Sequence, residues 1–177
     1  MIHSIVHRMI YRALVLTCLL TSGTVGAAEY VQVVHSPNTG SIEKLAASEL
    51  ADILGRVFDD IEVRSGESPV PHPQAGTIIF VGNPDTNSFI AREFADWPKV
   101  TNQGIVIRSA SQKRFYAIGG GSPAATLWAV YEFGHRLGIR YLLSGDLNPL
   151  SKRPFDLTGI ETTIEPQVRQ RGWETLG

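Results

Sequence analysis

The chain has 177 residues, of which 43% are hydrophobic, and its 16 Lys and Arg residues nearly balance its 17 Asp and Glu residues. The balance of charge, with no basic stripe, excludes the electrostatic footprint of a nucleic-acid-binding protein. The hydrophobic share is enough for a packed core, and the length favours one domain of ordinary size without internal repeats.

The first 28 residues have the layout of a secretory signal peptide. Arg8 and Arg12 provide a basic region, residues 13–20 form an apolar core, and residues 21–28 are small or polar. The apolar core is shorter than the roughly 20 residues that span a bilayer. We therefore expect cleavage after Ala27 or Ala28, an extracytoplasmic (periplasmic or secreted) location, and no membrane association of the mature protein.

The only cysteine, Cys18, lies inside this apolar core. A lipoprotein attachment site is the alternative interpretation, but Thr17 before the cysteine and Leu19 after it place it in the middle of the core. Without Cys18 the mature chain has no cysteine, so we expect neither disulfides nor thiolate chemistry.

Beyond the leader, alternating and helical patterns predict the remaining elements in chain order. Strands are expected at residues 30–34, 61–64, 77–81, 104–108, 114–118 and 139–143, a last extended segment at 159–164, and helices at 41–58, 87–94 and 122–137. Residues 65–76 contain three prolines and are expected to form an exposed loop. The strands at 104–108 and 114–118 are close enough in sequence to form an antiparallel hairpin.

Residues 41–58 have the clearest helical pattern in the chain. Ser41 is expected to cap the N-terminus of this helix, and Glu43 suits the positive end of the helix dipole. The predicted apolar face consists of Ile42, Leu45, Ala46, Leu50, Ile53, Leu54 and Val57. A single apolar stripe predicts a helix that covers one face of a sheet.

Residues 115–142 combine an apolar strand, three consecutive glycines and a second amphipathic helix. Ser122 is placed to cap this helix, Pro123 suits its first position, and Gly138 is expected to end it in the left-handed conformation. The predicted inner face consists of Leu127, Val130, Tyr131, Gly134 and Leu137. The whole run is typical of half of a small α/β domain.

The glycines at positions 119–121 allow two interpretations. They resemble a phosphate cradle at a helix N-terminus, but Ala124 and Ala125 follow where a dinucleotide fingerprint needs a third spaced glycine, and the Gly-Lys-Ser/Thr of a Walker loop is missing. A tight turn that lets the helix pack closely is the favoured interpretation. A small Rossmann-type enzyme remains an alternative, and it requires a parallel sheet with this turn open at its carboxyl edge.

Four stretches together resemble the N-terminal accessory domain of family 67 α-glucuronidases, which is similar to the second domain of family 20 β-hexosaminidases. They are residues 46–54, 78–82, 104–108 and 118–142, the last being the most specific. The resemblance covers about residues 30–145. It implies an α+β fold in which a mixed, partly antiparallel sheet carries two main helices on one face, beside a (β/α)8 barrel that holds the catalytic residues.

The tail extends the resemblance. Residues 165–173, EPQVRQRGW, resemble the point where such enzymes enter the first barrel strand, whereas a barrel takes about 250 residues. We therefore expect a signal peptide at 1–28, an accessory domain at 29–147, and at 148–177 a linker with the start of a missing barrel. Truncation, a frameshift or a split gene would each produce this organisation.

The acidic residues give no pair predicted to flank a glycosidic bond, which retaining and inverting glycosidases require. Glu132 is expected on a solvated helix face, and Glu174 lies on the predicted barrel strand without partners. Simple solubilising charges are expected at Asp146, Asp156, Glu161 and Glu165. The chain is expected to contain no catalytic residue.

The histidines and tryptophans give no clear pattern of a metal, catalytic or sugar-binding site. His35, His72 and His135 lack metal-ligand spacing, and no Gly-x-Ser-x-Gly elbow supports a Ser-His-Asp triad, although composition alone leaves a triad open. Trp128 is expected in the core, and Trp97 as a loop anchor or an exposed platform for sugar stacking. No metal or cofactor is expected.

These observations predict a non-catalytic accessory domain of a secreted glycoside hydrolase, α-glucuronidase-like or β-hexosaminidase-like. The expected partner is a (β/α)8 barrel, with a polysaccharide as a further partner of the parent enzyme. The alternative is a stand-alone secreted carbohydrate-binding or interaction module, which an exposed groove lined by aromatic side chains would indicate.

Overall fold

The computed structural model describes residues 28–72, 76–110 and 114–167. The elements are β1 (Glu29–Val34), α2 (Ser41–Val57), β2 (Ile61–Gly66), β3 (Thr77–Val81), α3 (Ser88–Glu93), β4 (Ile105–Ser109), β5 (Phe115–Gly120), α4 (Pro123–Arg136) and β6 (Thr162–Ile164). The predicted signal peptide, except its last residue, and both Trp173 and Glu174 lie outside the described residues.

The strands form one six-stranded mixed sheet in the order β2-β1-β3-β5-β4-β6. Strands β2, β1, β3 and β5 are parallel, whereas β4 is antiparallel to both β5 and β6. The predicted hairpin pairs Ile107 with Ile118. The sheet is therefore not all-parallel, and the predicted α+β fold is confirmed.

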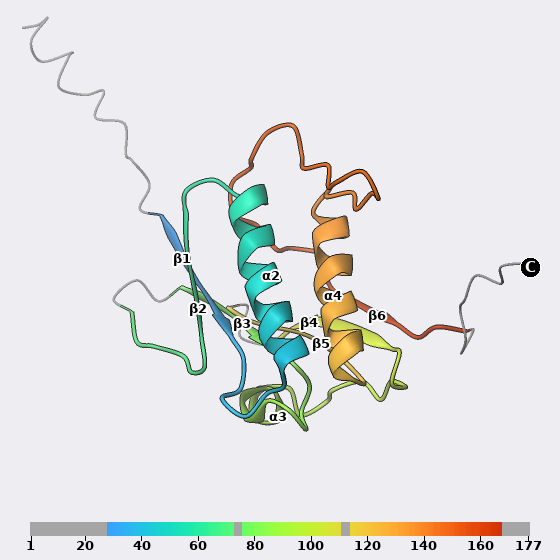
Figure 1. The fold of residues 1–177 in the computed structure, drawn as a ribbon. Coiled ribbons are helices and arrows are strands. Elements are labelled where there is room, and N and C mark those ends of the chain that lie inside the picture. The colour runs from blue at the N-terminus through green and yellow to red at the C-terminus, as the bar shows by residue number, and fades with distance from the viewer. Residues whose placement is uncertain (1–27, 73–75, 111–113, 168–177) are drawn as a thin grey trace, which may run out of the picture.

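Helices α2 and α4 lie side by side on one face of the sheet (Figure 1), where they cover the main core. Alternate strand residues such as Val31, Val33 and Ile79 point into this core because successive side chains of a strand face opposite ways. The opposite face carries a smaller cluster, in which Ile90 of α3 packs on Phe80. Two main helices on one face is the predicted arrangement.

Helix α2 departs from the prediction at its N-terminus. Its N-cap is Gly40, with no side-chain capping bond, so Ser41 does not cap the helix. Ile42 and Leu45 are exposed, whereas Glu43 is buried. The other five predicted positions of the face are in the core, together with Ala47, which was not predicted there.

Helix α4 begins and ends as predicted. The Ser122 hydroxyl accepts a hydrogen bond from the Ala125 amide, Pro123 follows, and Gly138 has a φ of 104°. The inner face differs in detail: Leu127 is only half-buried and Trp128 is 48% exposed, so the core prediction for Trp128 is wrong. The core positions are taken by Thr126, Ala129 and Phe133.

The predicted strand at 139–143 does not form. Arg140 pairs only with Leu147, through two backbone hydrogen bonds of 2.9 Å within a local loop. The segment is not part of the six-stranded sheet, whose edge strands are β2 and β6. Leu142 and Leu143 are consequently exposed.

The glycine run is explained by close packing. A Cβ on Gly119 would overlap the carbonyl oxygen of Gly82, and a Cβ on Gly121 would overlap the carbonyl oxygen of Thr101. A Cβ on Gly120 would overlap Ala125 of α4, so the glycines allow both this helix and the neighbouring loops to approach closely. The packing interpretation of these glycines is confirmed.

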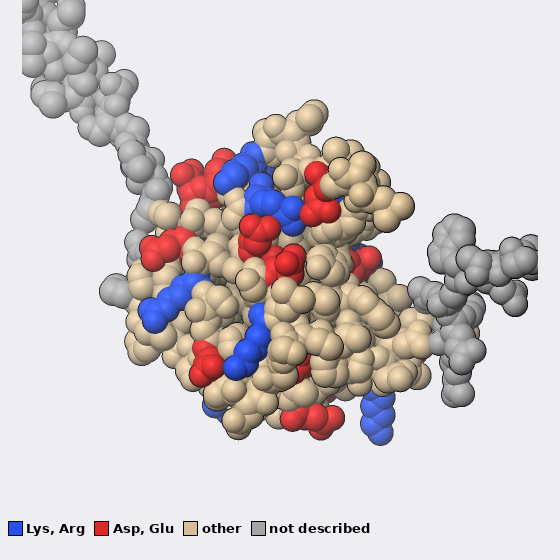
Figure 2. Space-filling model, viewed as in Figure 1, with Lys and Arg blue, Asp and Glu red and all other residues tan. Residues whose placement is uncertain are grey.

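Charges of both signs are interspersed over the face that carries α2 and α4, without a broad patch of one sign (Figure 2). The ion pair of Arg56 with Asp146, at 3.0 Å, belongs to this face. Among the helices of the described ranges, none has the length and apolarity to span a bilayer.

Tyr141 gives a pH-dependent prediction. Its hydroxyl is buried beside α4 and has no hydrogen-bond partner within the described part of the chain. Burial raises the pKa of Tyr141 to about 12, although nearby Arg56 opposes the shift. Because the folded state disfavours the phenolate, the unfolded state gains stability relative to the folded state once tyrosine starts to ionise. The folded state therefore keeps its full stability below the ordinary pKa of tyrosine and loses part of it as the pH rises from about 10 to 12.

We therefore expect the urea midpoint of the wild-type chain to fall more steeply between pH 10 and pH 11.5 than that of Tyr141→Phe. At pH 8 the variant should be at least as stable as wild type, since the buried hydroxyl has no hydrogen-bond partner among the described residues and its removal relieves a desolvation cost. A residual slope should remain in the variant because burial also raises the pKa values of Tyr116 and Tyr131. Identical pH profiles for the two proteins would contradict the assignment.

Candidate functional site

The connections after β1 and β3 leave the sheet toward opposite faces. Helix α2 follows β1 and covers the main core, whereas α3 follows β3 and packs on the smaller cluster. Between such neighbouring parallel strands the chain leaves a crevice at the carboxyl edge, which is where open α/β sheets bind ligands. The structure has a cleft of about 490 Å³ at this place.

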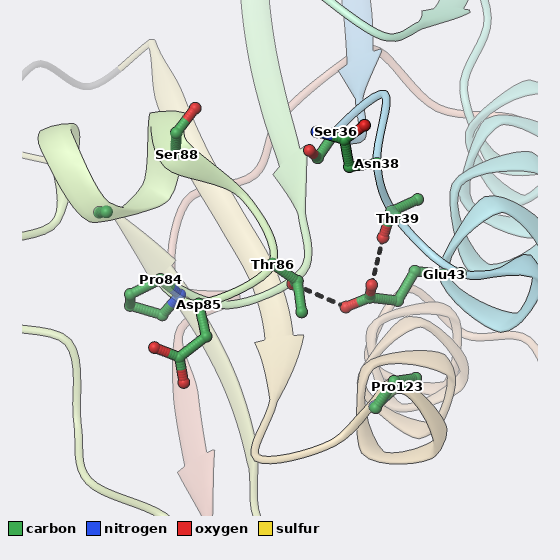
Figure 3. A pocket seen from close by; sticks show the side chains of 11 residues that line it. Ser36, Asn38, Thr39, Glu43, Pro84, Asp85, Thr86, Ser88 and Pro123 are labelled. Atoms are coloured by element: carbon green, nitrogen blue, oxygen red, sulfur yellow. Dashed lines mark hydrogen bonds between the residues drawn. The ribbon is translucent and has the colours of Figure 1, made fainter.

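Figure 3 shows the floor of this cleft, which is built around Glu43. Its carboxylate accepts a hydrogen bond from the Thr39 hydroxyl and, through its other oxygen, one of 2.8 Å from the Thr86 hydroxyl. Glu43 is 1% exposed and lies in the first turn of α2, where the helix dipole favours negative charge. The carboxylate thus joins the β1–α2 loop to the β3–α3 loop.

Two buried asparagines hold the β3–α3 loop in place behind this floor. Asn83 donates a hydrogen bond of 2.8 Å to the Gly120 carbonyl, and its side-chain oxygen accepts from the backbone amides of Asp85 and Thr86. Asn87 caps α3 and donates to the carbonyl of Val81. These bonds fix the cleft wall to the ends of β3 and β5.

The rim of the cleft differs from its floor. Ser36, Asn38, Asp85 and Ser88 line the cleft, and none of their side chains hydrogen-bonds to another residue of the described ranges. Pro84, Ala91 and Pro123 supply the apolar part of the wall. The lining contains two carboxylates and no Lys, Arg or aromatic residue, so it suits a neutral or cationic polar ligand rather than an anion.

Sequence reasoning missed this cleft. The one signal it had was Glu43, an acid among the buried positions of α2, which we interpreted as a partner for the helix dipole. A buried carboxylate needs hydrogen-bond donors, but Thr39 and Thr86 are 47 residues apart in the chain. Only the parallel pairing of β1 with β3 brings them together.

Of the acids weighed as candidates, Glu161 and Glu165 hold the C-terminal segment onto the domain. Glu161 accepts hydrogen bonds of 2.7 Å from the Ser109 amide and hydroxyl, which lower its pKa, and Glu165 accepts bonds from Thr101, which lower the pKa of its carboxyl. They are structural tethers rather than the simple solubilising charges that the sequence predicted.

The other described candidate acids also have hydrogen-bond or ion-pair partners. Asp146 pairs with Arg56, and hydrogen bonds from the Thr158 side chain and from its backbone amide lower the pKa of Asp156. Glu132 pairs with Arg136 one helical turn later, at 2.8 Å. None of them lines the cleft.

Among the described residues, His35, His72 and Trp97 lie in loops, whereas Trp128 and His135 lie in α4. His35 donates to the Ser36 carbonyl, His72 stacks on Tyr30, and His135 is exposed near the end of α4. Trp97 packs edge-on against Phe94, so its loop-anchor interpretation is confirmed. Over residues 28–72, 76–110 and 114–167, no three His, Cys, Asp or Glu side chains are grouped closely enough to hold a metal ion.

No family model matches the chain, and no curated protein matches it in sequence. Among solved structures, it is similar to a family GH115 4-O-methyl-alpha-glucuronidase with specificity for decorated arabinogalactans. The TM-score is 0.50 at 14% identity, over 65% of this chain and 14% of that protein.

Two further similarities are weaker. One is to a GH138 enzyme targeting pectin rhamnogalacturonan II, with a TM-score of 0.39 and 13% identity over 61% of this chain and 13% of that one. The other is to CpGH84D, with a TM-score of 0.44 and 11% identity over 67% and 19%. All three neighbours are glycoside hydrolases. This chain spans less than a fifth of the length of each, and the likeness is one of fold.

Proposed function

We propose that this chain is the non-catalytic N-terminal accessory domain of a secreted glycoside hydrolase of the α-glucuronidase or β-hexosaminidase type. Its partner would be a (β/α)8 catalytic barrel, and its place of action would be outside the cytoplasm. The observation that carries the proposal is the mixed sheet with α2 and α4 on one face, which is similar over 65% of the chain to one part of an α-glucuronidase.

The positions of the acids agree with a role that is not catalytic. Glycosidases place two carboxylates on either side of a glycosidic bond. In the described ranges Glu132 is ion-paired, Glu161 and Glu165 accept hydrogen bonds from other segments, and all three lie outside the cleft. In the cleft itself, Glu43 is buried and accepts two hydrogen bonds, which leaves Asp85 as the one exposed carboxylate.

The first test is an assay of the full chain with aryl glucuronides, aryl hexosaminides and xylo-oligosaccharides. We expect no hydrolysis above a blank. Turnover that Glu132→Gln or Glu174→Gln abolished, while Asp59→Ala left it intact, would overturn the proposal. The DNA directly downstream provides a second test, because a reading frame for a (β/α)8 barrel is the expected finding.

A stand-alone carbohydrate-binding module is the second candidate, and the cleft of about 490 Å³ is the observation that favours it. The aromatic lining expected of such a module is absent from this cleft, and exposed Trp128 is not among the residues that line it. The polar rim of the cleft therefore has to carry any binding.

A further inference from the structure

We propose that the cleft between the β1–α2 and β3–α3 loops binds a neutral saccharide, with Asp85 as the main hydrogen-bond acceptor for its hydroxyl groups. The choice of a saccharide among neutral polyols rests on the proposed function. The preference for a hydroxylated ligand that carries no negative charge rests on the cleft alone.

The polar groups on the floor of the cleft are already hydrogen-bonded, whereas those on the rim are not. On the floor, both oxygens of the Glu43 carboxylate already accept hydrogen bonds, from Thr39 and Thr86. On the rim, the side chains of Asp85, Asn38 and Ser88 are exposed and make no hydrogen bond with the described residues. A ligand can therefore use the rim groups without breaking bonds that hold the fold.

The loop that carries Asp85 is held rigidly on the sheet. The backbone amide of Asp85 donates a hydrogen bond of 2.9 Å to the Asn83 side chain, and Asn83 is itself anchored to the Gly120 carbonyl. The Asp85 carboxylate is consequently presented from a loop that is fixed on the sheet, and preorganisation of this kind lowers the entropic cost of binding. In Figure 3 Asp85 lies across the cleft from Asn38 and Ser36.

The residues that line the cleft suit a sugar and disfavour an anion. Amide and hydroxyl groups both accept from and donate to sugar hydroxyls, and a carboxylate accepts from them. The pyrrolidine rings of Pro84 and Pro123 offer apolar surface for the C–H groups of a sugar ring. No cationic side chain lines the cleft, and Glu43 and Asp85 disfavour phosphate or a uronate. The volume lies within the range of about 300–1,000 Å³ that is usual for small-molecule sites.

The test is a titration of the ¹⁵N-labelled full chain, followed by amide NMR shifts, with cellobiose or xylobiose as neutral probes and glucuronate and inorganic phosphate as anionic ones. We expect saturable shifts at Asn38, Gly40 and Asp85 with a neutral disaccharide, and a millimolar dissociation constant because no aromatic residue lines the cleft. The anions should give no saturable shifts there.

Asp85→Ala should weaken binding of the neutral disaccharide at least tenfold, because it removes a charged acceptor. Asp59→Ala is the matched control: Asp59 is also exposed and lies before β2, away from the cleft. Both variants should keep the wild-type melting temperature, so that a loss of binding is not a loss of fold.

Absence of saturable shifts with either disaccharide, or equal binding by Asp85→Ala and wild type, would overturn the site. Binding of phosphate or glucuronate in the cleft would also overturn it, because the lining would then select anions. The accessory-domain proposal would survive all of these outcomes, since it depends on hydrolysis and on the downstream gene. Hydrolysis by the chain would overturn that proposal while leaving the binding result intact.

Discussion

Replacing Gly119 by alanine should destabilise the protein by about 3 kcal/mol or more, which is large for the addition of one methyl group. Gly119 lies at the end of β5, where the backbone of Gly82 after β3 leaves no room for a Cβ. Neither backbone can move without disturbing the β3–β5 pairing or the hydrogen bond from the Gly82 amide to the Ile118 carbonyl. Urea unfolding followed by circular dichroism measures the loss.

The matched control is Gly55→Ala. Gly55 lies inside α2, and nothing lies within 4 Å of the position that its Cβ would take. Because glycine costs a helix interior about 0.5–1 kcal/mol relative to alanine, this variant should be more stable than wild type. If both variants shifted stability in the same direction by similar amounts, the close approach at Gly119 would be refuted.

Truncation of Leu54 to alanine should cost about 2–5 kcal/mol, out of a typical total stability of about 5–15 kcal/mol. Leu54 is fully buried between α2 and the sheet, and its removal leaves a cavity that the packed strands cannot close. The free energy of unfolding in urea is the relevant measurement.

Leu127→Ala serves as the comparison because Leu127 is an equally large side chain on α4 that is only half-buried. Its truncation should cost less than about 2 kcal/mol, in proportion to the smaller area that it removes from water. A loss below about 1 kcal/mol at Leu54, or a larger loss at Leu127 than at Leu54, would show that the assigned core faces are wrong.

The parts of the fold that follow from local chemistry could be predicted from the sequence. Ser122, Pro123 and Gly138 define the ends of α4 because capping and the left-handed conformation depend on neighbours in sequence. The hairpin of β4 and β5 was predictable for the same reason, since a short polar connection joins two apolar runs.

The sequence predictions were wrong where contacts between distant segments of the chain determine the structure. The apolar run at 139–143 has strand composition, but Arg140 pairs only with Leu147 in a local loop and the run does not join the sheet. Trp128 is on the outer face of α4 because small Thr126 and Ala129 lie against the sheet, which hydrophobicity alone does not indicate. The cleft depended on the pairing of β1 with β3, and a single sequence carries no signal for that register.

The position of β6 has a consequence for the order of folding. Strand β6 pairs with β4, so Ile105 meets Ile164, which lies 59 positions later in the chain. Such distant pairing is entropically slow to form. During synthesis on the ribosome, β4 can pair with β5 early, but its outer edge has no β6 to cover it until residue 164 has emerged. Until then the nascent domain exposes an unpaired strand edge. Such an edge can pair with another chain and aggregate unless a chaperone binds it.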